Sequence, residues 1–246
     1  MLGSERQRQI LAYMQEHESF QIKDVIKYFY VSEATARRDL NALEKSGAIK
    51  RVFGGATLVA RSDKQIPLFV RERENESEKN RIGIQAASLV KDGDILFIDG
   101  SSTTQFLLPY LQPYKDLVVI TNGLKIAETL GEMHVKVYCT GGLLIENSST
   151  LTGADAERFV DGFNADICFL SCKGLSEDGK LTDTSYMETQ LRKHFLENAK
   201  KRVVLITANK LGKKYLHTLC ESKDVDSIIT DAPLPYALPL RRIENT

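Results

Sequence analysis

The spacing of apolar residues divides the chain into two parts. In the first 60 residues, apolar side chains recur at helical spacing in three short segments, which predicts three helices. Two glycines at 54–55 then separate short runs at 49–53 and 56–59, which predicts a hairpin. From residue 82 onward, short apolar runs alternate with helical periodicity, which is typical of an α/β domain with a largely parallel sheet. The runs lie at 95–98, 117–120, 135–139, 167–170, 203–206 and 227–229.

Charge refines this division. The 246 residues include 33 Lys and Arg and 33 Asp and Glu, so the net charge of zero indicates no overall preference for nucleic acid. The first 64 residues, however, carry 11 basic and 8 acidic side chains, which indicates a basic N-terminal part. We therefore expect one domain at 1–60 and a second at 81–246. A linker at 61–80 joins them, and its charged stretch is a linker or the polar start of a helix.

Composition also excludes several classes of protein. The first ten residues hold no apolar run of the kind found in secretory signals, and no apolar run approaches the roughly 20 residues of a membrane helix. We therefore expect a cytoplasmic protein with no membrane partner. The four cysteines form no C-x-x-C pair, and no histidine completes a metal set. We expect reduced structural thiols, no metal and no cofactor.

The third predicted helix has two distinct faces. It follows Ser32, a residue type that caps helix N-termini well. On a wheel of about 100° per residue, Ala36, Leu40 and Leu43 share a side that faces a core. Asp39 lies toward that side, so we expect it to be a structural salt-bridge partner. The opposite side carries Ala34, Arg37, Arg38, Asn41 and Lys45.

This outer face has the residue types that read DNA. Arg hydrogen-bonds guanine edges, Asn hydrogen-bonds adenine, Lys holds phosphate, and a helix N-terminus offers free N–H groups to phosphate. The alternative is an ordinary solvated helix face. The context favours DNA, because a short helix, a tight turn at 30–31, a basic helix and a basic hairpin make a winged helix-turn-helix. Lys50 and Arg51 start the wing, where they suit contacts to the DNA backbone or minor groove.

Small, polar or charged residues follow every apolar run of the second domain. Because ligands bind beyond the carboxyl ends of the strands in an open α/β sheet, we expect one site for a phosphorylated polyol there. The Ser-Ser-Thr-Thr turn offers donors to a phosphate, Lys210 or Lys173 supplies positive charge, and Asp99, Asn122 and Asp183 accept from sugar hydroxyls. The alternative is that these are ordinary turn residues. The candidate binding residues are Asp99, Gly100, Ser101, Ser102, Thr103, Thr104, Thr121, Asn122, Gly141, Gly142, Lys173, Asp183 and Lys210.

The stretch VSEATARRDLNALEKSGAIKRVFGGA at 31–56 resembles the signature of the DeoR family of bacterial transcriptional regulators. The match includes the Thr-x-Arg-Arg-Asp-Leu core of the helix and the Gly-Gly-Ala of the wing, while a usual isoleucine is replaced by Ala36. The resemblance implies operator binding by the helix and wing. The candidate DNA-binding residues are Ser32, Ala34, Thr35, Arg37, Arg38, Asn41, Lys45, Lys50 and Arg51.

The second domain resembles the effector domain of the same family, whose fold is similar to those of sugar-phosphate isomerases and CoA transferases. The family run D-x-G-T-T is matched by Asp99, Thr103 and their neighbours, V-x-T-N by 119–122, G-G by 141–142, and the strand-end lysine by Lys210.

Two departures from the family pattern bear on the ligand. Ser101 or Ser102 stands where glycine is usual, so we expect Gly100 to take over its conformational role. Thr207 replaces the usual aspartate three residues before the lysine, which removes one charge from the site.

The sequence favours a receptor over an enzyme. A sugar-phosphate isomerase needs a carboxylate base beside its substrate carbon, and the chain carries only fragments of the isomerase patterns. We expect Glu188 to be solvated or paired with Arg192 at i+4. Our first hypothesis is a repressor that binds operator DNA as a homodimer or homotetramer and responds to a phosphosugar effector. The rival is a cytosolic sugar-phosphate isomerase with an accessory DNA-binding head.

Overall fold

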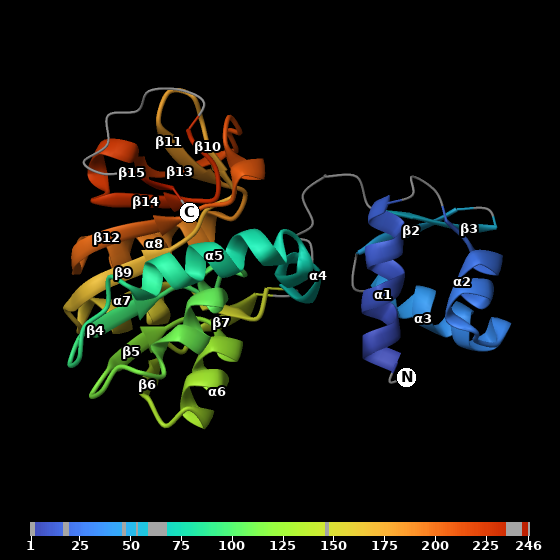
Figure 1. The fold of residues 1–246 in the computed structure, drawn as a ribbon, viewed down its shortest axis with the longest axis horizontal. Helices are drawn as coiled ribbons and strands as arrows, with labels where there is room; N and C mark the ends of the chain where they lie inside the picture. Colours follow the sequence, from blue (N-terminus) through green and yellow to red (C-terminus); the bar gives the residue numbers. More distant parts are fainter. Residues whose placement is uncertain are drawn as a thin grey trace. The chain divides into compact units, whose positions relative to one another are not determined.

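The structure, a computed structural model, describes residues 3–16, 20–45, 48–52, 54–58, 68–145, 148–234 and 243–245. The chain divides into two compact units, Met1–Glu74 and Asn75–Thr246 (Figure 1). Within the described ranges, no helix is long and apolar enough to cross a membrane. Part of the stretch predicted as a linker is helical, because α4 (Leu68–Arg73) and the start of α5 (Glu76–Ala87) lie in it.

The first unit combines three helices with a small antiparallel sheet, as the periodicity predicts. The predicted hairpin is formed by β2 and β3, which pair antiparallel around a turn at Gly54, where φ is +79°. A third strand, β1, pairs with β3 and was not predicted, because two residues are too few to show a period. The elements are α1 (Gly3–Glu16), β1 (Phe20–Gln21), α2 (Ile22–Phe29), α3 (Glu33–Lys45), β2 (Ile49–Val52) and β3 (Gly55–Leu58).

A single apolar core holds this unit together. The predicted inner face of α3 is confirmed, because Ala36, Leu40 and Leu43 are buried against α1 and α2. The predicted turn is also confirmed: Tyr30 ends α2 in a left-handed conformation with φ of +50°. The hydroxyl oxygen of Ser32 accepts from the Thr35 N–H at 3.2 Å, so Ser32 caps α3.

The second unit is built on a seven-stranded sheet in which every neighbouring pair is parallel, with strand order β15-β14-β12-β9-β4-β5-β6. This confirms the predicted α/β class. The strands are β4 (Ile95–Ile98), β5 (Val118–Thr121), β6 (Lys136–Cys139), β9 (Ala165–Leu170), β12 (Ala199–Leu205), β14 (Ser227–Thr230) and β15 (Ile243–Asn245).

Helices cover both faces of this sheet (Figure 1). Alternate residues of each strand point to opposite faces, so Phe97 packs with α8 while Leu96 and Ile98 pack with α5. Burial on both faces explains why these strands appear in the sequence as continuous apolar runs. The covering helices are α7 (Ala154–Asp161) and α8 (Tyr186–Glu197) on one face, and α5, η1 (Thr104–Leu111) and α6 (Leu124–Glu132) on the other.

Two small antiparallel sheets lie outside the main sheet and were not predicted. Their strands are two to five residues long and only partly apolar, so they carry little periodic signal. One sheet has the order β10-β11-β13 and the other pairs β7 with β8. Their bounds are β7 (Leu143–Ile145), β8 (Thr150–Thr152), β10 (Gly174–Leu175), β11 (Lys180–Asp183) and β13 (His217–Glu221).

Candidate functional site

The outer face of α3 is exposed, as the helical wheel predicts. Ala34, Arg37, Arg38, Asn41 and Lys45 all lie on the surface. On the wing Lys50 is exposed and Arg51 is half-buried. The side chains of Arg38, Lys45 and Lys50 have no partner among the residues that the structure describes. Three cations are therefore presented to solvent by one helix and the strand after it.

Other members of the predicted DNA-binding set are held within the unit. Arg37 pairs with Glu33 at 2.6 Å, one turn earlier on α3. Arg51 Nη1 donates to Asn41 Oδ1 at 3.4 Å, and its backbone N–H donates to Glu44 at 3.3 Å. These two contacts fasten the wing to α3, so the basic groups of both elements keep a fixed spacing.

Asp39 has the structural role that its place on the wheel predicts. Its Oδ2 lies 2.5 Å from Nε of Arg6 on α1, and its Oδ1 accepts from the amide of Gln7 at 3.3 Å. Only 1% of Asp39 is exposed. The carboxylate therefore joins α1 to α3 from inside and is not part of the outer face.

The polar segments of the second unit lie at one edge of the main sheet. Because all its strands run parallel, their carboxyl ends meet there. Residues 99–104 follow β4, 122–123 follow β5, 140–142 follow β6, 171–173 follow β9, and 206–210 follow β12. The polar segments therefore lie along one edge of the sheet, as predicted. That edge is longer than one small ligand.

Residues 100–104, called the anion loop below, are shaped by hydrogen bonds at both ends. The Gly100 N–H donates to Asn122 Oδ1 at 2.8 Å, which uses an acceptor that we had assigned to a sugar hydroxyl. The Thr104 N–H donates to Ser101 Oγ at 3.3 Å, and the Thr104 hydroxyl donates to the Asp99 carbonyl at 2.6 Å. Ser101 and Thr104 therefore stabilise the loop itself.

Gly100 is needed for space and not for an unusual backbone angle, which corrects our expectation. It does not have a positive φ. A Cβ at this position would lie 3.0 Å from the Gly123 Cα and would overlap the Thr150 side chain. The loops after β4 and β5 thus approach so closely that only glycine fits.

The middle of the anion loop presents unused donors. Among the described residues, the N–H groups of Ser102 and Thr103 and the Ser102 hydroxyl have no hydrogen-bond partner. Both residues are nonetheless buried. Lys210 Nζ lies 3.1 Å from Ser171 Oγ and 3.5 Å from Thr103 Oγ1. Three strand ends thereby bring a cation, hydroxyls and free N–H groups together. We call Ser102, Thr103, Ser171 and Lys210 the anion cluster.

Lys210 is held by its own short helix, η2 (Ala208–Lys210). The Ala208 N–H donates to Asp231 Oδ1 at 2.7 Å, so the aspartate after β14 fixes the start of η2. Thr207, which replaces the usual aspartate, is buried and donates to Asn209 Oδ1 at 2.7 Å. Its hydroxyl is used within the turn.

Asp99 and Asp183 are engaged by an arginine that we had not assigned to the site. Arg192 of α8 places Nε 2.6 Å from Asp99 Oδ2 and Nη1 2.9 Å from Asp183 Oδ2. The exposed fractions are 7% for Arg192, 0% for Asp99 and 2% for Asp183. We call these three residues the arginine clamp. The expectation that both carboxylates face sugar hydroxyls is not met, because the clamp uses them.

The clamp is electrostatically stable. Burial raises the pKa of Asp183, but Arg192 and Lys173 outweigh burial and hold that pKa below its ordinary value. Burial likewise opposes the charge on Arg192, but Asp99 and Asp183 raise the pKa of the guanidinium above its ordinary value. Lys173 is half-buried beside Asp183 and serves as a cation of this cluster.

Glu188 is buried, which corrects the expectation of a solvated carboxylate. Only 6% of the residue is exposed, and its Oε1 accepts from the Thr150 hydroxyl at 3.0 Å. Its charge also raises the pKa of Arg192 one turn later, in keeping with the expected i+4 relationship.

The remaining predicted residues lie farther along the edge. Thr121 Oγ1 accepts from the Gly123 N–H at 3.0 Å, so its hydroxyl closes the turn after β5. Gly141 and Gly142 have φ of +69° and +100° and are exposed. They follow β6, which is four strands from β12, or about 19 Å at the usual strand spacing. These glycines therefore line a different part of the edge from Lys210.

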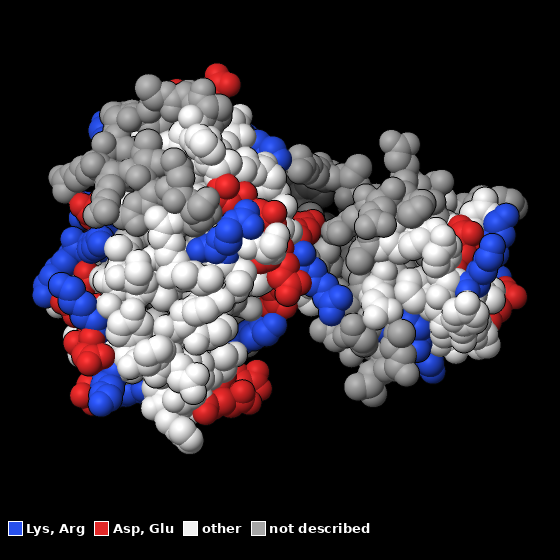
Figure 2. Space-filling model, in the orientation of Figure 1, with Lys and Arg blue, Asp and Glu red and all other residues white. Residues whose placement is uncertain are grey.

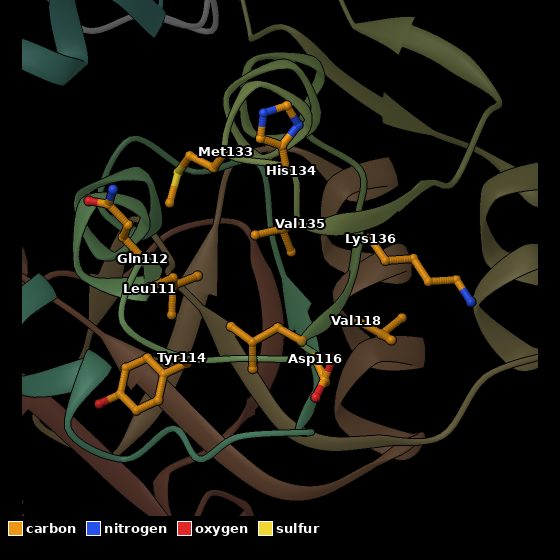
Figure 3. A pocket seen from close by; sticks show the side chains of 10 residues that line it. Leu111, Gln112, Tyr114, Asp116, Val118, Met133, His134, Val135 and Lys136 are labelled. Carbon is orange, nitrogen blue, oxygen red and sulfur yellow. The ribbon is translucent and has the colours of Figure 1, made fainter.

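A separate pocket of about 350 Å³ opens at the opposite edge of the sheet, where β5 and β6 begin (Figure 3). Tyr114 at its side donates its hydroxyl to the Ala87 carbonyl at 2.9 Å. None of the predicted binding residues lines it. The lining residues are Leu111, Gln112, Tyr114, Asp116, Leu117, Val118, Met133, His134, Val135 and Lys136.

One face of the second unit shows how its surface charges are distributed. On the face drawn in Figure 2, Lys and Arg of the second unit are interspersed with Asp and Glu around an uncharged area. That face offers no one-sign patch of the kind that follows a DNA backbone. The exposed cations of α3 and the wing therefore remain the candidate nucleic-acid surface.

Comparison with known proteins agrees with this division. Residues 6–62 match the model of the DeoR-like helix-turn-helix domain, and residues 74–232 match the DeoR C terminal sensor domain. This chain belongs to the DeoR family. Members are transcriptional regulators, so the chain is a DNA-binding regulator with a sensor domain, and the enzyme hypothesis is set aside.

Relatives of this DeoR-family chain extend over almost its whole length. The HTH-type transcriptional regulator GolR of Listeria innocua is 34% identical over 97% of this chain and 94% of that protein. The HTH-type transcriptional repressor GlcR of Bacillus subtilis is 31% identical over 94% of this chain and 89% of that protein. The glycerol-3-phosphate regulon repressor of Escherichia coli is 28% identical over 97% of this chain and 94% of that protein.

Solved structures give a more distant comparison for the second unit. Ribose 5-phosphate isomerase A of Methanocaldococcus jannaschii has a TM-score of 0.42 and 20% identity, covering 56% of this chain and 55% of that chain. A 4-hydroxybutyrate CoA-transferase of Porphyromonas gingivalis has a TM-score of 0.41 and 15% identity, covering 63% of this chain and 46% of that chain.

Proposed function

We propose that this DeoR-family regulator is a cytoplasmic repressor of sugar-metabolism genes. A phosphorylated sugar controls the affinity of the repressor for operator DNA. The observation that carries the proposal is the anion cluster, in which Lys210 reaches from β12 to Ser171 and Thr103 beside unused N–H groups. A cation with convergent neutral donors, at a depth that water reaches poorly, suits a phosphate.

The DNA-binding half of the proposal rests on α3 and the wing. Arg38 and Asn41 lie on the exposed face of α3 and suit guanine and adenine edges in the major groove. Lys45 and Lys50 suit phosphates. The hydrogen bond from Arg51 to Asn41 joins the wing to α3, so both elements would approach DNA together.

Operator binding requires more than one copy of this unit. A single recognition helix buries too little surface for the affinity of a specific regulator, and paired half-sites are the usual remedy. We therefore propose a homodimer or homotetramer. Two-fold symmetry in the protein would appear as a palindromic or repeated operator.

The effector half of the proposal concerns a ligand with a phosphate and a small polyol. The anion cluster combines a cation with hydroxyls and N–H donors and contains no carboxylate, so it favours the phosphate end. The Escherichia coli relative is a glycerol-3-phosphate regulon repressor, and this name supports a small phosphorylated effector for this chain. Effector binding would shift the equilibrium between arrangements of the DNA-binding units that bind the operator and arrangements that do not. The expected coupling free energy is about 1–3 kcal/mol.

The test is DNA binding with and without phosphosugars. Fluorescence anisotropy with DNA from upstream of the chain's own gene measures affinity, and a panel of phosphosugars measures the response. Lys210→Ala is expected to leave DNA affinity unchanged and to abolish the response. Lys200→Ala is the matched control, because that lysine lies on β12 in an exposed pair with Asp166. A full response in Lys210→Ala would overturn the proposed site, and absence of sequence-specific binding would overturn the proposed function.

A further inference from the structure

Asp99 connects the arginine clamp to the anion loop. It is the residue directly before the loop, and its Oδ1 accepts from the Ser101 N–H at 3.3 Å. Its carbonyl accepts from the Thr104 hydroxyl at 2.6 Å, and its Oδ2 is held by Arg192. One residue thus ties both ends of the loop to α8, so a displaced Asp99 would carry the loop with it.

Arg192 also fixes Asp99 relative to a second support. Its Nη1 donates to Asp183 Oδ2 at the end of β11. Asp183 Oδ1 accepts from the backbone N–H groups of Thr184 and Ser185 at 2.6 and 3.3 Å. Ser185 in turn caps α8. The planar guanidinium can serve two carboxylates at once, whereas an ammonium is a point charge. The clamp is therefore a rigid brace between β4, β11 and α8.

The brace has an electrostatic consequence for an anion. Asp99 is within a few residues of the unused donors of Ser102 and Thr103, and it is fully buried. An uncompensated buried carboxylate there would repel a phosphate in a medium that screens charge poorly. Arg192 supplies the compensating charge from α8, through its contact with Asp99 Oδ2.

We infer that Arg192 is a positioning residue for effector binding: it holds Asp99, sets the anion loop, and cancels the carboxylate charge that would otherwise oppose a phosphate. This inference rests on the proposed function, which places the phosphate at the anion cluster. In this inference Arg192 acts through Asp99, because its Nε and Nη1 are both held by the carboxylates of the clamp.

The test measures inorganic phosphate binding by calorimetry, together with urea unfolding of each variant. Arg192→Gln is expected to weaken phosphate binding by on the order of tenfold or more, because it leaves Asp99 unpaired. The double variant Asp99→Asn/Arg192→Gln removes the charges of Asp99 and Arg192 together and keeps similar shapes. Asp183 stays charged in both variants, with Lys173 as its neighbouring cation, so the comparison isolates the Asp99 charge. The double variant is expected to bind phosphate more tightly than Arg192→Gln. Arg158→Gln is the matched control, because that arginine forms an exposed pair with Asp155 on α7.

Each outcome of these measurements either supports or overturns the positioning role of Arg192. A purely structural arginine would lower the urea midpoint in both clamp variants alike without separating their phosphate affinities, and that result overturns the inference. Wild-type affinity in folded Arg192→Gln overturns it too. If Arg192→Gln does not fold, the phosphate affinity of Arg192→Lys is compared with that of Asp99→Asn/Arg192→Gln. The inference requires the double variant to bind phosphate. Failure of the wild type to bind phosphate would remove the proposed phosphate site, and this inference with it.

Discussion

Arg6 Nε and Asp39 Oδ2 lie 2.5 Å apart in the interior of the first unit, one on α1 and the other on α3. The residue next to Asp39 on α3, Arg38, is exposed and points away from the core. A buried ion pair therefore sets the orientation of the same helix whose outer face carries the candidate DNA-binding residues. Its removal is expected to affect DNA binding without changing any of those candidate residues.

Asp39→Ala is expected to destabilise the first unit by about 3–5 kcal/mol, because it removes the carboxylate partner of a buried ion pair with Arg6. DNA binding should fall with it, while the second unit stays folded. Urea unfolding followed separately in the two units measures this. Glu33→Ala, which breaks the exposed pair with Arg37, should change stability by under about 1 kcal/mol. Equal effects of the two variants would contradict the assigned role of Asp39.

Arg38→Ala and Lys50→Ala are expected to weaken DNA binding in different ways. Loss of a base-reading arginine should cost about 1–3 kcal/mol and relax sequence preference at one position. Loss of a phosphate-contacting lysine should weaken binding to all sequences and reduce the slope of log affinity against log salt by about 1. Titrations at several salt concentrations, with specific and scrambled DNA, separate the two. A flat salt response in the wild type would contradict the basic surface.

Gly100→Ala is expected to destabilise the second unit and weaken the phosphosugar response, because the new methyl group would overlap Thr150 and crowd Gly123. Gly131→Ala is the matched control: Gly131 lies within α6, and a Cβ added there would meet no other atom within 4 Å. Alanine there should be neutral or stabilise by up to about 1 kcal/mol, since it favours helix. Thermal unfolding measures both changes. A tolerated Gly100→Ala would mean that the two loops can separate at little cost.

The clamp predicts a stability change in acid. The pKa of Asp183 in the folded protein is below its ordinary value, so its contribution to stability is fully present above about pH 4 and is lost as pH falls through the folded pKa. Unfolding midpoints measured from pH 7 to pH 3 should therefore fall at the acid end. Asp183→Asn should start from a lower midpoint and lose less of it in acid. Parallel pH profiles would show that Asp183 does not contribute this linkage.

The thiols fit the expectation of structural cysteines. Cys168 and Cys172 are buried, and burial raises the pKa of Cys172 to about 11. Such a thiol carries almost no thiolate at neutral pH and reacts slowly. Cys168 and Cys172 therefore fit the role of structural thiols.

The sequence by itself determined the parts of the protein that follow local periods. The inner and outer faces of α3, its Ser32 cap, and the parallel strands with polar carboxyl ends all appear in windows of a few residues. The place of Lys210 at the carboxyl edge was also predicted this way, because a residue that follows a buried parallel strand lies at that edge of the sheet.

Only the tertiary structure decided which polar groups are used by the protein and which remain for a ligand. Asp99 and Arg192 are 93 residues apart, so no local pattern pairs them, and their ion pair withdraws a carboxylate that had suited a sugar hydroxyl. Gly100 likewise owes its identity to Gly123 and Thr150 on other segments. Hydrogen-bond satisfaction depends on neighbours in space, and neighbours in space are set when the whole sheet is assembled.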